Sequence, residues 1–377
     1  MRLLLMHPLA GLPSRQDLYI GLQRQTEWEL LIVTPRRWKD DYGRIVEASA
    51  SPDLRGQLLA LPIGRSGNYP LHYFRSRLKK YIREFEPDCI YLCHEPYAVS
   101  TFQMLRAAKA VTSVPVGVRS SQNIAKRYPS PFRQAERFVY RNSDFAIVVT
   151  ENVANVMRTK GYTKPISVIP MPVDLRTFSP PPARSHGSQM RIGFVGRLVP
   201  EKGVDTALMA VSRLPRGSVN LTIIGDGSYG PELQKLANSL GLDDAVTWLG
   251  ALDRVSTAAA FQDFDIVLVP SKETKRWREQ FGRVVVEAAA TAVPVIATRS
   301  GELPFLVAAA NAGWIVEEGN AIEMAEVLRV LLDDRTQLRQ VGQRARDAVI
   351  ERYSEQVVID QLAHTLSEAV ASRAEPC

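Results

Sequence analysis

The chain has only three cysteines in 377 residues, which is too few for a disulfide framework. Cys89 and Cys93 lie in one strand region, Cys377 is terminal, and no other Cys/His pair has zinc-ligand spacing. No apolar run approaches the roughly 18 residues that cross a bilayer, and the apolar core of residues 1–8 is too short for a signal peptide. These absences disfavour secreted disulfide-rich and membrane-spanning classes and predict a cytoplasmic protein.

What is present is typical of a globular protein with an anionic partner. The length predicts two domains, because single cores stop growing near this size. The net charge is +7 and the pI is about 9.3. Such a charge attracts nucleotides, phospholipid surfaces or nucleic acids, and by itself it does not choose among them.

Short apolar runs alternate with helical patterns along the chain, and such alternation predicts parallel, doubly wound α/β sheets. We expect one domain over residues 1–178, a proline-rich linker over 179–190, a second domain over 191–353 and a long helix over 354–377. Helices are expected over 73–84 and 102–110. The expected strands are Leu3–Met6, Leu30–Val33, Cys89–Leu92, Val114–Val118, Phe145–Val149, Arg191–Val195, Leu221–Ile224, Val246–Leu249, Ile266–Pro270 and Val293–Ala297.

Residues 267–298 read as strand, helix and strand, a unit that binds ligands beyond the carboxyl ends of its strands. Glu279 precedes the expected helix, where free N–H groups attract anions such as phosphate. Glu287 lies within the apolar helix, where a carboxylate is costly to bury without a partner. The alternative to a binding role is that Glu279 is an ordinary surface residue and that Glu287 has a hydrogen-bonding partner inside the protein.

Glu279 and Glu287 have seven residues between them, and Phe281-Gly282 follows the first. This arrangement resembles the donor-site signature of retaining glycosyltransferases of family 4. The resemblance implies a GT-B fold, in which two Rossmann-like domains face each other across a cleft and the helix expected over 354–377 crosses back to the first domain. It also implies that Glu279 binds the donor sugar's hydroxyls, Glu287 the ribose, and the helix start at Phe281 and Gly282 the diphosphate.

The run Gly193–Gly203 continues the resemblance, because the family has a glycine-rich strand end followed by an arginine and a lysine. Arg197 and Lys202 stand at those places. The resemblance implies that they neutralise the diphosphate without a metal, stabilising charge where it develops. The alternative is two solvated surface cations.

Gly225-Asp226-Gly227-Ser228-Tyr229-Gly230 matches G-x-G-x-x-G literally. A dinucleotide site would need an acidic residue at the end of the next strand, and the strand 246–250 has none. The family has a similar loop in its nucleotide pocket, which implies roles for Gly225 and Gly227, and for the backbone at Leu249 beside the base. Glycines that only form tight turns remain the alternative.

The loop at Gly301 resembles the family's GG-x-P-E loop beside the donor sugar, so Gly301 is a further donor candidate. Here Glu302 replaces the second glycine and Phe305 replaces the usual acid. These departures bear on the identity of the sugar.

The first domain carries fewer signals. Gly11 follows the first strand, where relatives have a glycine-rich loop near the donor phosphates. Gln122 stands near the position of a family histidine that contacts the donor sugar, and as an amide it can hydrogen-bond but not act as a base. His94 ends another strand and is an acceptor-side candidate, although a histidine there is commonly structural.

Two basic-aromatic stretches, 72–81 and 126–141, contribute to the high pI. They suit docking on an anionic bilayer, as lipid-linked acceptors would require. Solvated charges around helices with buried aromatic residues explain them equally well.

Together these residues predict a retaining, metal-independent glycosyltransferase that needs no cofactor. The expected donor is a UDP-sugar, with a GDP-sugar next, and the acceptor a saccharide or lipid-linked sugar for surface polysaccharide or glycolipid synthesis. We expect a cytoplasmic protein, peripheral on the membrane, without a nucleic-acid partner. The alternatives are a nucleotide-sugar epimerase on the same fold and a non-catalytic nucleotide-sugar-binding protein.

Overall fold

The computed structural model describes residues 1–39, 43–181 and 187–374, which form two compact units. The first unit contains Met1–Pro170 and Gln356–Cys377, and the second contains Met171–Glu355. The chain therefore passes into the second unit before residue 178, where the first domain was predicted to end. Phe178 explains the difference, because it is 2% exposed and its ring packs 5.8 Å from that of Phe261. Residues 182–186 of the predicted linker, and Cys377, lie outside the described residues.

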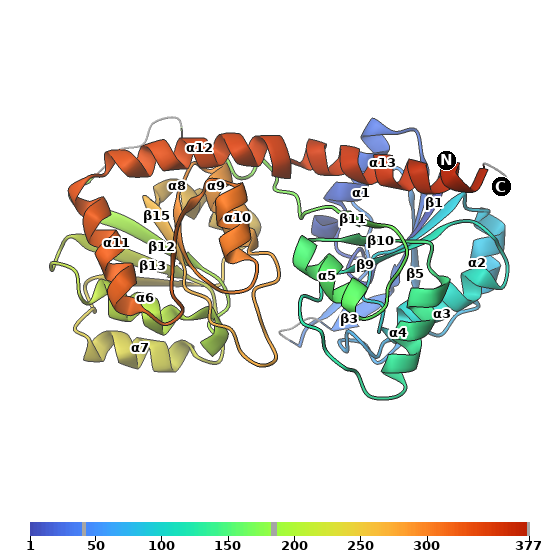
Figure 1. Cartoon of the computed structure of the whole chain (residues 1–377), viewed down its shortest axis with the longest axis horizontal. Coiled ribbons are helices and arrows are strands. Elements are labelled where there is room, and N and C mark those ends of the chain that lie inside the picture. The colour runs from blue at the N-terminus through green and yellow to red at the C-terminus, as the bar shows by residue number, and fades with distance from the viewer. Residues whose placement is uncertain (40–42, 182–186, 375–377) are drawn as a thin grey trace. The chain divides into compact units, whose positions relative to one another are not determined.

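The sheet of the first unit has the strand order β11-β10-β9-β8-β1-β2-β5, and its neighbours pair in parallel (Figure 1). Its central strands are buried apolar runs, as strands covered on both faces should be. Their bounds are β1 Arg2–Met6, β2 Glu29–Pro35, β5 Gln57–Leu61, β8 Cys89–Leu92, β9 Val116–Ser120, β10 Phe145–Val148 and β11 Ile166–Val168.

The helices of the first unit cover this sheet, and its small hairpins lie outside it. Ile359 of the last helix packs in the same core as Leu22 of the first, so the C-terminal helix belongs to the first unit. The helices are η1 Pro13–Arg15, α1 Asp17–Gln25, α2 Leu78–Phe85, α3 Val99–Lys109, α4 Phe132–Asn142, α5 Glu151–Thr159 and α13 Glu355–Ala374. The hairpins pair β3 Arg37–Lys39 with β4 Ile45–Glu47, and β6 Ile63–Gly64 with β7 Tyr73–Phe74.

The second unit has a parallel sheet of order β14-β13-β12-β15-β16-β17. The strands are β12 Met190–Val195, β13 Val219–Ile224, β14 Val246–Gly250, β15 Ile266–Val269, β16 Val295–Thr298 and β17 Gly313–Val316. The helices are η2 Pro200–Lys202, α6 Val204–Val211, α7 Gly230–Ser239, α8 Arg254–Asp263, α9 Arg283–Ala290, α10 Leu303–Ala309, α11 Ala321–Asp333 and α12 Thr336–Tyr353.

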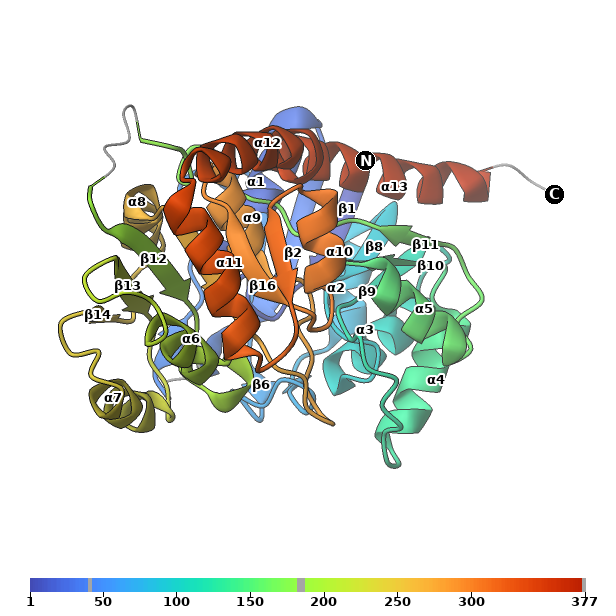
Figure 2. The ribbon, with the colours of Figure 1, turned by 60° about the vertical axis from the view of Figure 1, so that its left-hand side comes forward.

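The central strands β15 and β16 of the second unit are buried and apolar on both faces, as strands between two layers of helices should be. Ile266 and Leu268 of β15 face the core under α6, α7 and α11, and α6 and α11 pack side by side (Figure 2). Val267 and Val269 face the other core, under α8, α9, α10 and α12. The predicted α/β class, with two doubly wound parallel sheets, is confirmed. None of the helices in the described ranges is long and apolar enough to cross a membrane.

Candidate functional site

The candidate residues of the second unit follow five different strands of its sheet, β12 to β16. Arg197 and Lys202 follow β12, Gly225 and Gly227 follow β13, and Leu249 ends β14. Glu279, Phe281 and Gly282 follow β15, and Gly301 follows β16. Because the carboxyl ends of parallel strands meet at one edge, these residues share the edge where such sheets bind ligands.

Two of the three predicted catalytic residues are in direct contact. The Lys202 Nζ donates to Glu279 Oε2 at 2.6 Å, although the residues are 77 positions apart. The Ser271 hydroxyl also donates to Glu279, at 3.1 Å, and the Glu279 residue is 9% exposed. The carboxylate is thus compensated in a largely buried place, as a buried charge must be.

Arg197 lies on the loop after β12, which also carries Lys202. Its side chain is exposed and has no ion-pair partner among the residues that the structure describes. A guanidinium carries its charge at any physiological pH. An unpaired arginine next to the strand edge is free to contact an anionic ligand.

Backbone hydrogen bonds tie the loops of this edge together. Leu198 N donates to Asp226 O at 2.9 Å, and Lys272 N donates to Glu201 O at 2.8 Å. Gly225 has φ +142°, and a Cβ there would lie 1.8 Å from Gly196 O, so only glycine fits. The loop that carries Arg197 is therefore held against the loop that follows β13.

Other donor candidates have different surroundings. Glu287 on α9 forms an ion pair with Arg283 at 3.4 Å and its side chain is 16% exposed, so it is not the deeply buried acid that the apolar run indicated. Phe281 is 3% exposed and its ring lies 6.2 Å from that of Tyr353. Because its side chain is packed in the core, only its backbone is available to a donor. Gly282 is the N-cap of α9, and Leu249 is 45% exposed at the end of β14.

The loop with Gly301 is anchored beside Glu279. Gly301 N donates to Glu273 Oε1 at 2.8 Å, and Glu302 N donates to Glu279 O at 3.1 Å. Glu302, which replaces a family glycine, is itself buried at 7% exposure. The departure from the family pattern therefore stands directly next to the predicted sugar contact.

In the first unit, His94 is buried, and the acceptor-side role predicted for it stays a prediction. His94 is 3% exposed, its Nε2 lies 3.2 Å from Tyr69 O, and its ring packs 4.4 Å from that of Tyr69. Burial, and secondarily the neighbouring His72, hold its pKa well below the ordinary value. Burial of this kind favours the neutral imidazole.

The other first-unit candidates lie in loops at the carboxyl ends of strands. Gln122 uses its amide locally: its Oε1 accepts from Ile124 N at 3.2 Å and its Nε2 donates to Tyr128 at 3.3 Å. Gly11 O accepts from Ser49 N at 2.9 Å. Gly11 follows β1 as predicted, and a donor role for either residue stays a prediction.

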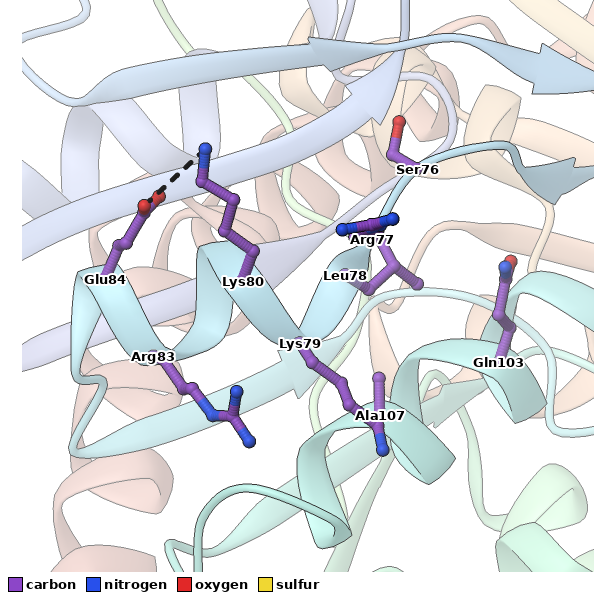
Figure 3. Close-up of a pocket in the computed structure, with 9 residues that line it drawn as sticks. All are labelled: Ser76, Arg77, Leu78, Lys79, Lys80, Arg83, Glu84, Gln103 and Ala107. Carbon is purple, nitrogen blue, oxygen red and sulfur yellow. Dashed lines mark ion pairs between the residues drawn. The ribbon is translucent and has the colours of Figure 1, made fainter.

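The two basic stretches, which are distant in sequence, extend into α2 and α4, which both contact α3. α3 contacts both α2 and α4, and the rings of Phe102 and Phe138 lie 5.0 Å apart. α2 begins at Leu78, not at residue 73, because Tyr73 and Phe74 pair with β6. A hollow between α2 and α3 is lined by basic side chains (Figure 3). The exposed cations of the three helices and the α2 N-cap, called the basic face below, are Arg77, Lys79, Lys80, Arg83, Arg106, Arg133, Arg137 and Arg141.

Comparison with known proteins gives two family matches that together span most of the chain. "Glycosyltransferase Family 4" matches residues 17–177 and "Glycosyl transferases group 1" matches residues 177–348. A putative colanic acid biosynthesis glycosyltransferase, WcaL, of Escherichia coli is 29% identical over 66% of this chain. A D-inositol 3-phosphate glycosyltransferase of Corynebacterium jeikeium is 32% identical over 55% of it. These matches span 61% and 54% of the relatives' lengths.

A solved structure, that of HepE from Anabaena in complex with UDP, has a TM-score of 0.76. It covers 98% of this chain and 100% of its own, at 18% identity. A likeness at that identity concerns the fold, and it confirms the predicted GT-B fold.

Proposed function

The chain belongs to glycosyltransferase family 4, and from this we propose that it transfers a sugar from a nucleoside diphosphate sugar to a saccharide or lipid-linked acceptor. The observation that carries the proposal is the contact between Lys202 and Glu279 at the ligand-binding edge of the second sheet. A cation for a diphosphate and a carboxylate for sugar hydroxyls stand side by side there. Transfer occurs with retention of configuration and without a metal, as the family resemblance implies.

In the proposed step, the bond from the sugar's anomeric carbon to the diphosphate oxygen breaks as the acceptor oxygen bonds to that carbon on the same face. The acceptor's proton passes to the departing phosphate. Lys202 and Arg197 stabilise the negative charge that develops on the leaving group. Glu279 accepts hydrogen bonds from the sugar.

The proposed nucleotide is UDP, with GDP next. HepE, which shares the fold, has been solved with UDP, and UDP is the commoner nucleotide in the family that the motifs resemble. The proposed acceptor belongs to surface polysaccharide or glycolipid synthesis, and the name of the colanic acid biosynthesis relative supports the polysaccharide. The protein works on the cytoplasmic side.

The test is turnover of UDP-, GDP-, dTDP- and ADP-sugars by the full chain, with and without a chelator. We expect one donor to release its nucleoside diphosphate at a rate that chelation leaves unchanged. An altered nucleotide sugar without diphosphate release would indicate an epimerase. Tight binding of one nucleotide, with no product across a panel of saccharide and lipid acceptors, would indicate a binding protein. Loss of turnover on chelation would contradict the metal-independent mechanism.

The basic face extends the proposal to a membrane-bound acceptor. Lys79, Arg83 and Arg137 are exposed and have no ion-pair partner among the described residues, while Leu78, Ile82 and Phe85 of α2 face the core. The exposed side of these helices is thus charged and not apolar. Such a face binds an anionic bilayer electrostatically, without insertion.

Charge reversal at Lys79 and Arg83 is expected to release the protein from vesicles that contain phosphatidylglycerol. Each cation contributes about 1 kcal/mol near an anionic surface, so loss of two lowers affinity about thirty-fold and reversal lowers it further. Arg216→Glu/Lys235→Glu, the same charge change at exposed sites of the second unit, is the control in co-sedimentation. An equal loss of vesicle binding in both double variants would show that net charge alone, and not the basic face, determines the binding.

A further inference from the structure

Trp277 is an aromatic residue at the donor edge that the sequence motifs do not include. It lies in the loop between β15 and α9, two residues before Glu279. Thr274 N donates to Trp277 O at 2.8 Å, and Trp277 N donates to the Thr274 hydroxyl at 2.9 Å. These two hydrogen bonds close a tight turn and fix the backbone from which the indole projects.

The indole ring contacts the ammonium that the reaction requires. Lys202 Nζ lies 5.0 Å from the centroid of the Trp277 ring, which is within the range of a cation–π interaction. The same ammonium donates to Glu279 at 2.6 Å. Lys202 therefore has an aromatic ring and a carboxylate as neighbours, and its side chain is 22% exposed.

Trp277 is half-buried and is not among the residues of the two core clusters found in the described part of the second unit. Its position is thus not explained by packing of the core. Lys202 has a long, flexible stem that loses entropy when it is held in one place. A ring that holds the ammonium in advance lowers that cost when the diphosphate binds.

We propose that Trp277 is a positioning residue, which holds the Lys202 ammonium where the donor diphosphate binds; this rests on the proposed function. The diphosphate takes the ammonium's hydrogen bonds from Glu279, and the ring keeps its contact throughout. The gain in affinity is the ordering cost of the Lys202 side chain that the ring meets before the diphosphate binds, which corresponds to about twofold to tenfold.

The test is a double-mutant cycle of Trp277→Leu and Lys202→Met, with Kd for UDP measured by calorimetry. Trp277→Leu is expected to weaken UDP binding about twofold to tenfold in the native background and to have almost no effect in the Lys202→Met background. Trp277→Phe, which keeps an aromatic face, should recover most of the affinity. Thermal melting of each variant shows whether the fold is retained.

Intrinsic fluorescence adds a readout that a purely structural role would not change. The spectral contribution of Trp277, taken as native protein minus Trp277→Phe, should change when UDP binds and when Lys202 becomes methionine. An equal loss of affinity from Trp277→Leu in both backgrounds would overturn the positioning role and leave the proposed function intact. If the native protein binds no nucleoside diphosphate, the proposed function falls, and this inference with it.

Discussion

Glu279→Gln is expected to have opposite effects on turnover and on product binding. Turnover should fall about ten- to a hundredfold, because a charged acceptor of sugar hydroxyl bonds is lost. UDP should bind more tightly, by up to about tenfold, because Lys202 no longer has to leave a carboxylate 2.6 Å away to meet the diphosphate. In the native protein, UDP alone leaves Glu279 without its ammonium partner, whereas a UDP-sugar supplies hydroxyls to that carboxylate.

Calorimetry with UDP and steady-state kinetics with the full donor would measure the two effects. Glu317→Gln is a matched control, because Glu317 pairs with Arg299 at 2.7 Å and both side chains are 58% exposed. Breaking that pair should change neither quantity, since exposed ion pairs contribute little. Weaker UDP binding by Glu279→Gln would show that Glu279 assists the diphosphate site and does not compete with it.

Gly203→Ala is expected to destabilise the second unit by several kcal/mol. Gly203 follows Lys202, has φ +65°, and a Cβ there would lie 1.8 Å from the backbone oxygen of Pro270. The backbone of the Lys202 turn must move to relieve this contact. Because about 1 kcal/mol lowers the Tm of a domain of this size by roughly 2–4 °C, a fall of about 10 °C is expected. UDP affinity should fall with it, because Lys202 is displaced.

Gly217→Ala separates the strain of a left-handed backbone from the strain of the close contact with Pro270. Gly217 has φ +74°, close to the value at Gly203, but nothing lies within 4 Å of an added Cβ. It should therefore cost only the roughly 1–2 kcal/mol of a left-handed backbone. Thermal unfolding of both variants makes the comparison, and equal losses would mean that the close approach to Pro270 relaxes without cost.

The fold class and the order of the larger elements follow from the amino-acid sequence alone. The runs at Leu3–Met6 and Ile266–Pro270 are apolar on both faces, as central strands under two helix layers must be, so they are visible without any partner. Short strands on the margins, such as β3, β6 and β17, were missed. They have two to four residues and are half-exposed, so pairing with a neighbour, and not their own composition, makes them strands.

The sequence also determined which loops carry the candidate site, since Arg197, Lys202 and Glu279 each follow a recognisable strand. The contacts of these residues are visible only in the folded chain. The Lys202–Glu279 pair and the ring of Trp277 depend on the crossing of two loops that are distant in sequence. The burial of His94 depends likewise on Tyr69, 25 residues away. The pattern of apolar residues within one segment indicates whether that segment is a helix or a strand. These contacts arise from the packing of one element against another, which no single stretch of sequence encodes.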